Sequence, residues 1–236
     1  MIKNLYKKFL VSIYERNHKL RELALRLNLS SSSSKIRAQT KSSRIVEYPW
    51  IYMNIDKANV CKRILDIGSV GSDLPIKLAA QGYEVWCIDI RKYEGNGFIH
   101  NLKCIVGDVR RTSFENDFFD CVIAVSTLEH IGLGRYGEWL ESDGDITAIS
   151  EISRILSING TLLITLLFGK GEIYPKHRVY NKKRLQIILD GFKIEGENYY
   201  VRNKNGFWSS CKKEDLAEIQ SPQVEMGLAC IKARKI

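Results

Sequence analysis

No segment of the sequence approaches the roughly 20 apolar residues that a membrane-spanning helix needs. The longest uncharged apolar piece near the N-terminus, Phe9–Tyr14, is too short for a signal-peptide core and lacks a cleavage-like tail. The six cysteines form no C-x-x-C pair, and no His, Cys or carboxylate residues stand at metal-site spacing. We therefore expect a cytoplasmic protein without a bound metal, whose cysteines are free thiols that pack as small apolar side chains.

Length and charge bound the class of protein further. With 236 residues, of which 44% are hydrophobic, the chain suits one or two compact domains and excludes a disordered or collagen-like protein. The formal net charge of +9 is unevenly placed: residues 1–50 carry 11 Lys and Arg against 3 Asp and Glu, and residues 51–236 carry 25 against 24. The charge that would favour a nucleic-acid partner therefore belongs to the first segment.

That first segment differs from the rest in its pattern. Over residues 2–29, apolar side chains recur at helical spacing with Lys and Arg between them, which predicts a basic amphipathic helix. The serine run 30–34 predicts a flexible joint. We thus divide the chain into a leader with its linker, 1–44, and a domain, 45–236. Such a helix suits peripheral contact with an anionic membrane, docking to a partner, or covering of the ligand site, and these alternatives stay open.

Strands and helices alternate along the domain, which predicts a doubly wound α/β fold with a mainly parallel sheet. Strands are expected at Arg63–Ile67, Glu84–Ile88, Lys103–Val106, Asp120–Val125 and Thr161–Leu167, and an antiparallel edge pair at Phe192–Arg202 and Val224–Lys232. Helices are expected after Ser72 or Asp73, at Ile146–Leu156 and at Lys182–Leu189. Because ligands of such sheets bind beyond the carboxyl ends of the strands, the chemistry should follow Ile67, Ile88, Val106 and Val125.

Three of these strand ends carry an acid. The first strand leads into Asp66-Ile67-Gly68-Ser69-Val70-Gly71, where glycines allow a tight turn close to a ligand. A dinucleotide-binding loop would need glycine where Asp66 stands, and an acid there suits a ligand with an amino group. Asp89 lies 21 residues beyond Gly68, a spacing typical of a carboxylate that binds both ribose hydroxyls. Asp108 follows the third strand, placed to hold an adenine amino group.

With these residues, the stretch from Ile64 to Phe168 resembles the class I S-adenosylmethionine-dependent methyltransferases. Within them, Ser126-Thr127-Leu128-Glu129-His130-Ile131 is similar to the ubiquinone-biosynthesis-like group, and the run to Asp145 resembles members associated with sugar or glycan modification. The resemblance implies a Rossmann-like sheet of seven strands that ends in the edge hairpin. It also implies S-adenosylmethionine as cofactor. The candidate cofactor-binding residues are Asp66, Gly68, Ser69, Gly71, Asp89, Ile90, Asp108, Val109 and Ser126.

In one respect the glycine loop departs from the family pattern. The family places glycines at the second, fourth and sixth positions after the acid, where this chain has Gly68, Val70 and Ser72. Taken alone, Asp89 also suits a helix cap and Asp108 a turn.

His130 is the first candidate for a catalytic base. An imidazole with an ordinary pKa of about 6.5 can take the proton of a sugar hydroxyl while a methyl group is transferred. Glu129 is placed to orient it. The alternative is a histidine at a helix end that bonds a backbone carbonyl. His177, after the fifth strand, is a second candidate histidine, placed to contact the acceptor.

The segment 132–145, called here the 132–145 loop, is predicted to bind the acceptor. It has four glycines, Tyr136 and Trp139 to stack on a sugar ring, Arg135, and four acids that leave it with a net charge of −3. Since a groove for phosphates should be basic, this loop argues against a nucleic-acid substrate. The alternative is an ordinary surface loop.

The leading hypothesis is an O-methyltransferase for a small hydroxylated acceptor such as a sugar or glycan unit. Three alternatives stay open: methylation of a quinone or lipid ring at a membrane surface, a non-catalytic cofactor-binding protein, and a nucleic-acid-binding module that uses the basic leader. The sequence leaves the oligomeric state open.

Overall fold

The computed structural model describes residues 42–57, 60–94, 97, 99–219 and 225–236. The leader helix predicted over 2–29 and the serine run lie outside these residues. Contacts divide the chain into two units, Met1–Ile45 and Val46–Ile236, and the fold below is that of the second. The predicted boundary after residue 44 stays a prediction.

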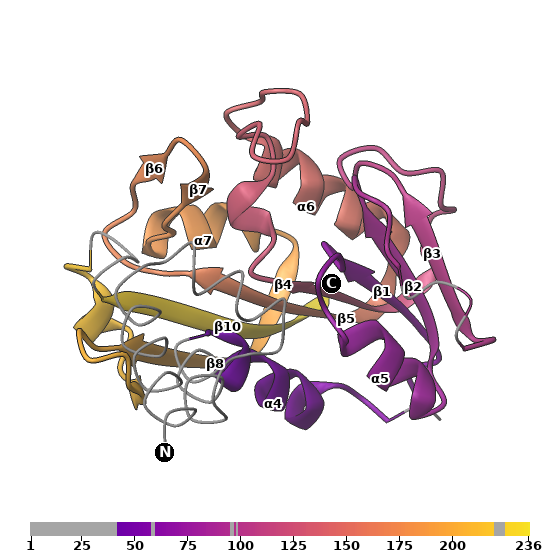
Figure 1. Cartoon of the computed structure of the whole chain (residues 1–236), viewed down its shortest axis with the longest axis horizontal. Coiled ribbons are helices and arrows are strands. Elements are labelled where there is room, and N and C mark those ends of the chain that lie inside the picture. The colour runs from indigo at the N-terminus through magenta and orange to yellow at the C-terminus, as the bar shows by residue number, and fades with distance from the viewer. Residues whose placement is uncertain (1–41, 58–59, 95–96, 98, 220–224) are drawn as a thin grey trace, which may run out of the picture. The chain divides into compact units, whose positions relative to one another are not determined.

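A mixed sheet runs through the described part of the chain, with eight strands in the order β3-β2-β1-β4-β5-β10-β8-β9 (Figure 1). Their bounds are β1 Arg63–Ile67, β2 Glu84–Asp89, β3 Leu102–Val106, β4 Phe119–Val125, β5 Leu156–Leu167, β8 Phe192–Arg202, β9 Trp208–Cys211 and β10 Met226–Lys235. Strands β1 to β5 are parallel, and β10 is antiparallel to both β5 and β8. The predicted Rossmann-like α/β fold is confirmed.

The end of the sheet differs from the prediction in one strand. The predicted hairpin forms between β8 and β10, but β10 lies inside the sheet, and β9 pairs with β8 at the edge. The sheet therefore has one strand more than the seven expected, because Trp208–Cys211 is too short and polar to stand out as a strand. A separate two-stranded sheet joins β6, Ile173–Tyr174, to β7, His177–Arg178.

Helices cover both faces of the sheet. In Figure 1, α6 and α7 lie on one face, and α4 and α5 lie on the other. Their bounds are α4 Arg44–Asn54, α5 Leu74–Ala80, α6 Gly144–Ile155 and α7 Lys182–Ile188, with short 3-10 helices η1 Leu128–His130 and η2 Glu214–Leu216. No helix in the described part of the chain combines the length and apolar character needed to span a bilayer.

The apolar spacing in the sequence explains how the helices pack. In α6, Ile149, Ile152 and Ile155 are buried against the strands, as their spacing predicts, and Ile146 packs at the edge of that core. On the other face, Trp50 of α4 and Leu74 and Leu78 of α5 are buried in a second core. Burial of each such side chain stabilises the fold by about 1.5–3 kcal/mol.

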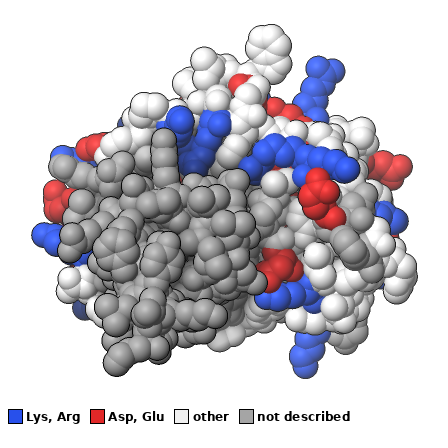
Figure 2. All heavy atoms as spheres, in the orientation of Figure 1, with Lys and Arg blue, Asp and Glu red and all other residues white. Residues whose placement is uncertain are grey.

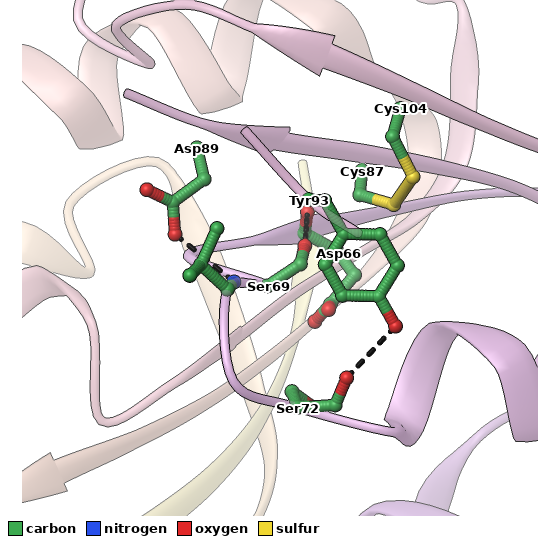
Figure 3. Close-up of a disulfide and its surroundings, with 8 residues drawn as sticks. Asp66, Ser69, Ser72, Cys87, Asp89, Tyr93 and Cys104 are labelled. Carbon is green, nitrogen blue, oxygen red and sulfur yellow. Dashed lines mark hydrogen bonds between the residues drawn. A yellow bond between two sulfur atoms is a disulfide. The ribbon is translucent and has the colours of Figure 1, made fainter. Parts of the chain in front are cut away.

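The expectation of free thiols is wrong for two cysteines. Cys87 of β2 and Cys104 of β3 lie opposite each other in register and form a disulfide (Figure 3). The sequence could not show that these two cysteines are neighbours, because this depends on which strands pair and in what register. Cys61, Cys121 and Cys230 are free and buried, and Cys211 is free and half-buried.

The topology brings the predicted strand ends together. β1 lies between β2 and β4, so the strand order reverses at β1, which is the usual place of a ligand site in such a sheet. The carboxyl ends of β1, β2, β3 and β4 consequently meet at one edge of the sheet, where Asp66, Asp89, Asp108 and Ser126 stand.

Candidate functional site

A glycine turn follows β1 at this edge. Gly68 has a φ of +76°, and a Cβ atom there would lie 2.5 Å from Oγ1 of Thr127. Thr127 in turn donates to the carbonyl oxygens of Ile67 and Val125, at 3.0 and 3.1 Å. Gly68 therefore allows the turn after β1 to contact the turn after β4. Gly71 also has a positive φ, +85°, and faces open space.

Side chains hold the turn in place (Figure 3). The buried Ser69 donates from Oγ to the carbonyl oxygen of Asp66 at 3.0 Å. The backbone N–H of Val70, where the family pattern has glycine, donates to Oδ2 of Asp89 at 3.1 Å. Val70 thus takes part in the site through its backbone, while its side chain packs against the core.

Two tyrosines hold the other end of the turn. Tyr93 donates to the carbonyl oxygen of Ser72 at 2.8 Å, and the hydroxyl of Tyr48 lies 2.8 Å from Oγ of Ser72. Burial and the nearby carboxylate of Asp66 raise the pKa of Tyr93 to about 12. Tyr93 therefore stays a hydrogen-bond donor at neutral pH. Ser72 also accepts from the N–H of Leu74, while Asp73, the other predicted alternative, is the N-cap residue of α5.

Asp89 ends β2 and accepts four hydrogen bonds. Besides Val70, its donors are the backbone N–H, Nε and Nη2 of Arg91, at 3.0, 3.1 and 3.0 Å. The Asp89 side chain is almost fully buried, whereas that of Arg91 is 39% exposed. No helix begins after Asp89 in the described residues, so the helix-cap alternative is wrong, and the carboxylate is open to a new ligand only if Arg91 moves.

Asp108 repeats this arrangement after β3. It accepts from the backbone N–H of Arg110 at 2.9 Å and from its guanidinium at 2.6–3.1 Å. Burial raises the pKa of Asp108, but the hydrogen bonds and charge of Arg110 outweigh this effect and lower it. Arg110 also donates to the carboxylate of Glu141 at 2.8 Å and to the carbonyl oxygen of Trp139 at 3.0 Å. It therefore links Asp108 to the 132–145 loop.

Ser126, at the end of β4, is held by a residue that the sequence did not single out. Its hydroxyl donates to Oε1 of the fully buried Glu47 in α4. Thr165 donates to the same oxygen at 2.6 Å. Ser126 has a φ of +45°, so Glu47 stabilises a backbone conformation that a serine rarely adopts.

His130 ends the 3-10 helix after β4. Its Nδ1 atom lies 2.7 Å from the carbonyl oxygen of Lys176. Because a carbonyl only accepts, Nδ1 carries the hydrogen, which leaves Nε2 as the proton acceptor of the neutral ring. The carbonyl bond of the alternative interpretation is therefore present, and it also orients the ring for the predicted role. Glu129 is buried, with 1% of its surface exposed, and its role in orienting the ring stays a prediction.

His177 comes from the β6–β7 hairpin and lies near the same group. Its ring stacks on Tyr174 with the centroids 4.8 Å apart. Burial and the positive charge of Arg135 lower the pKa of His177. The guanidinium of Arg135 lies 3.2 Å from Nδ1 of His130 and 3.4 Å from the Lys176 carbonyl oxygen. The predicted residues His130, Arg135 and His177 are thus brought together.

The acids of the 132–145 loop are paired with other groups of the protein. Glu141 binds Arg110, and Glu138 accepts from the backbone N–H groups of Arg135 and Tyr136. Asp143 and Asp145 bind Arg184, at 3.1 and 2.6 Å. Each of these acids thus has an arginine or a backbone N–H group of the described residues as its partner, and acceptor binding by this loop stays a prediction.

A buried arginine closes the base of this loop. Arg178 donates to the carbonyl oxygens of Ile131 and Ser142, at 2.6 and 2.7 Å, and forms an ion pair with Asp145 at 3.4 Å. Tyr180 also donates to Asp145, at 2.8 Å. Neither side chain of the Arg178–Asp145 pair is exposed. The two ends of the loop are therefore held together inside the protein.

The two aromatic residues of the loop differ in their contacts and exposure. The Tyr136 ring has the guanidinium carbon of Arg91 4.1 Å and that of Arg135 5.3 Å from its centroid. It thus bridges the end of β2 and the histidine group. Trp139 and Leu140 have no such contacts and are 87% and 79% exposed. Only Tyr136 of the two predicted aromatics lies beside the strand ends.

The signal for Arg91 and Arg110 was present in the sequence. Each stands two residues after a strand-end acid, in Asp89-Ile90-Arg91 and Asp108-Val109-Arg110. Glu47 carried no such signal, because its contacts span 79 and 118 residues of sequence.

A cavity in the described part of the chain lies away from this site. A cavity of about 610 Å³ is lined by Lys62, Glu84, His100 and Lys103 among others, at the amino ends of β1 to β3 and so at the opposite edge of the sheet. No group of three His, Cys, Asp or Glu in the described ranges is arranged to hold a metal.

Known proteins match this chain in two ways. Residues 98–218 match the family model described as "Caenorhabditis protein of unknown function, DUF268". No curated protein matches the chain in sequence. Solved structures match its fold at low identity.

One of these is the 1,6-didemethyltoxoflavin-N1-methyltransferase of Burkholderia thailandensis, solved with S-adenosylhomocysteine, with 14% identity, a TM-score of 0.58 and coverage of 86% of this chain and 88% of that chain. A S-adenosylmethionine-dependent methyltransferase from Methanosarcina mazei has 17% identity, a TM-score of 0.55 and coverage of 80% and 98%. The [4+2]-cyclase SpnF has 18% identity, a TM-score of 0.56 and coverage of 83% and 81%. The chain therefore has the fold of class I methyltransferases.

Proposed function

The chain belongs to the DUF268 family, and we propose that it is a S-adenosylmethionine-dependent methyltransferase that methylates a hydroxyl group of a small acceptor, such as a sugar or glycan unit. The observation that carries this proposal is the row of carboxylates, Asp66, Asp89 and Asp108, at the ends of three adjacent parallel strands beside the Gly68 turn.

The donor set of the site fits this cofactor. Its amino group, ribose hydroxyls and adenine amine are all hydrogen-bond donors, and each carboxylate of the row is an acceptor. Asp66 would hold the amino group, Asp89 the ribose and Asp108 the adenine. Arg91 must first give up Asp89, which its partly exposed side chain allows. When bound, S-adenosylmethionine supplies a methyl group that is already activated for transfer.

The remaining work of the chain is to place the acceptor and to take its proton. Orientation of an acceptor hydroxyl can lower a barrier by about 7–11 kcal/mol. Nε2 of His130 would accept the hydroxyl proton, while the Lys176 carbonyl holds the ring through Nδ1. A positioned base of this kind adds about 10²- to 10⁴-fold to the rate.

A second candidate is methylation of a quinone or lipid ring at a membrane surface. It is favoured by the exposure of Trp139 and Leu140, since an aromatic and an aliphatic side chain at the end of a loop suit the interface of a bilayer. A binding protein or an enzyme without methyl transfer is a third, because a [4+2]-cyclase shares this fold.

The experiment is incubation of the protein with S-adenosylmethionine carrying an isotope-labelled methyl group and, in separate samples, a pool of glycans and glycosides or a pool of quinones, followed by mass spectrometry. We expect a product heavier by one labelled methyl group. His130→Ala should lower its formation at least about 100-fold and leave S-adenosylhomocysteine binding unchanged. Methylation of added quinones alone would favour the second candidate, and cofactor binding without any product would favour the third.

A further inference from the structure

The group formed by His130, Arg135, Lys176 and His177 has a charge that the proposed function leaves unexplained. These side chains come from two segments, η1 with the 132–145 loop and the β6–β7 hairpin. Contacts at 2.7–3.5 Å join His130, Arg135 and the Lys176 backbone. The group therefore forms one built surface rather than scattered residues.

Acids that could neutralise this group are engaged elsewhere. Within the described part of the chain, neither the Arg135 guanidinium nor the Lys176 ammonium has a carboxylate within ion-pair distance. Glu138 is bonded to backbone N–H groups, Glu172 accepts from Tyr174, and Glu141 binds Arg110. Glu129 is buried, with 1% of its surface exposed, and so is not part of this surface. The surface that faces an acceptor thus has a positive charge, although the loop has a formal charge of −3.

One more ring nitrogen lies beneath this surface. The buried Nε2 atom of His177 has no hydrogen-bond partner among the described residues. Burial and the charge of Arg135 lower the pKa of His177. The Arg135 guanidinium therefore lies close enough to His177 to act on it electrostatically. In Figure 2, Lys and Arg side chains form a band on this face, beneath the uncharged end that projects at the top.

We propose that this group binds an anionic part of the acceptor, a carboxylate or a phosphate, next to the hydroxyl that receives the methyl group. The assignment rests on the proposed function for the role of the ligand as acceptor. An arginine can bond either anion through two N–H groups, and Tyr136 between Arg135 and Arg91 places the group beside the end of β2. The acceptor class is then an acidic sugar, either a uronate or a sugar phosphate.

The test is an NMR titration of the full chain that follows the histidine ring signals, each assigned by a single His→Gln variant. The probes are methyl β-glucuronide, glucose 1-phosphate and the neutral methyl β-glucoside. We expect the signals of His130 and His177 to move and saturate with at least one anionic probe. The glucoside should bind about ten-fold more weakly or not at all, since a charge-assisted hydrogen bond is lost. The signal of His100, at the opposite sheet edge, should not move.

Matched variants make the test specific. Arg135→Gln should weaken the anionic probe about ten-fold, and Lys193→Gln, which removes an exposed cation at the amino end of β8, should leave it unchanged. The NMR signals of His130 and His177 also distinguish the two anions, because they should move with the glucuronide if the site binds a carboxylate and with glucose 1-phosphate if it binds a phosphate. Equal binding of the glucoside, no shift with either anion, or an unchanged affinity in Arg135→Gln would overturn the inference.

Calorimetry with S-adenosylhomocysteine separates this inference from the function on which it rests. Cofactor binding without anion binding overturns the anion site and leaves the methyltransferase proposal. Anion binding by a protein that binds no S-adenosylhomocysteine leaves the anion site in place. That result overturns the role of the anion as part of a methyl acceptor.

Discussion

The Arg178–Asp145 pair is fully buried, whereas in the Arg91–Asp89 pair the arginine side chain is 39% exposed. In the first, Arg178 also bonds the carbonyl oxygens of Ile131 and Ser142, so neither partner can turn to water. In the second, Arg91 can be solvated as it leaves, and Asp89 can then accept from a ligand. The same two residue types therefore hold a loop at one place and, at the other, keep in position the carboxylate that we propose to bind the cofactor.

Removal of one partner from the buried pair should have the largest effect. Asp145→Asn leaves the charge of Arg178 without compensation inside the protein, and we expect a loss of about 3–5 kcal/mol in the free energy of unfolding. Trp139→Ala, in the exposed part of the same loop, should change it by less than about 0.5 kcal/mol. Urea denaturation of the two variants measures both, and equal losses would show that the base of the loop is not held by this pair.

The strand-end pair should respond in ligand binding instead. Asp89→Asn keeps the shape of the side chain but removes the charge, and we expect the affinity for S-adenosylhomocysteine to fall about ten- to 100-fold. Asp73→Asn is the matched control, because Asp73 forms an exposed pair with Lys77 outside the row of carboxylates. Calorimetry decides: similar affinities of the two variants would remove Asp89 from the binding site.

An intermediate pair sharpens the comparison through pH. Hydrogen bonds from Arg154, followed by those of Thr112, lower the pKa of Glu151 to about 2 against the opposing effect of burial. The pair should therefore stabilise the folded state above the ordinary pKa of 4.5, and this contribution should disappear as the pH falls from about 4.5 to about 2. Glu151→Gln should cost about 1–2 kcal/mol at neutral pH, after allowance for solvent screening. A stability difference that persists at the lowest measurable pH would contradict this explanation.

Arg91→Gln should have the smallest effect, and of the opposite sign. The variant frees Asp89 from the side chain that a ligand must displace, so we expect S-adenosylhomocysteine to bind about two- to five-fold more tightly. Weaker binding would instead mean that Arg91 contacts the ligand directly. The free energy of unfolding should change by less than about 1 kcal/mol.

Much of the fold could be predicted because it depends on local patterns. The strand ends at Asp66, Asp89 and Asp108 follow from apolar runs that stop at an acid, and parallel strands place those ends at one edge. The strand β9 and the Cys87–Cys104 disulfide could not, since edge pairing and register depend on contacts between distant segments. The sequence also identified His130, Arg135 and His177 without showing that they meet, and it gave no sign of Lys176.

The partners of charged side chains were the least predictable part of the site. The net charge of −3 counted Glu141, Asp143 and Asp145 as if they faced the acceptor, whereas each is bound to an arginine from another segment. Glu47 was missed for the same reason, since a helix far earlier in the chain brings it to Ser126 and Thr165. Residue counts fix the charge of a segment, and only the fold decides which side of it that charge faces.

The most direct test of the central claim is a crystal structure of the protein with S-adenosylhomocysteine. We expect the ligand at the carboxyl ends of β1, β2 and β3, with its amino group at Asp66, its ribose hydroxyls at Asp89 and its adenine amine at Asp108. The Arg91 side chain should have moved away from Asp89. A ligand bound elsewhere, or no ligand at saturating concentration, would contradict the claim that this row of carboxylates is a cofactor site.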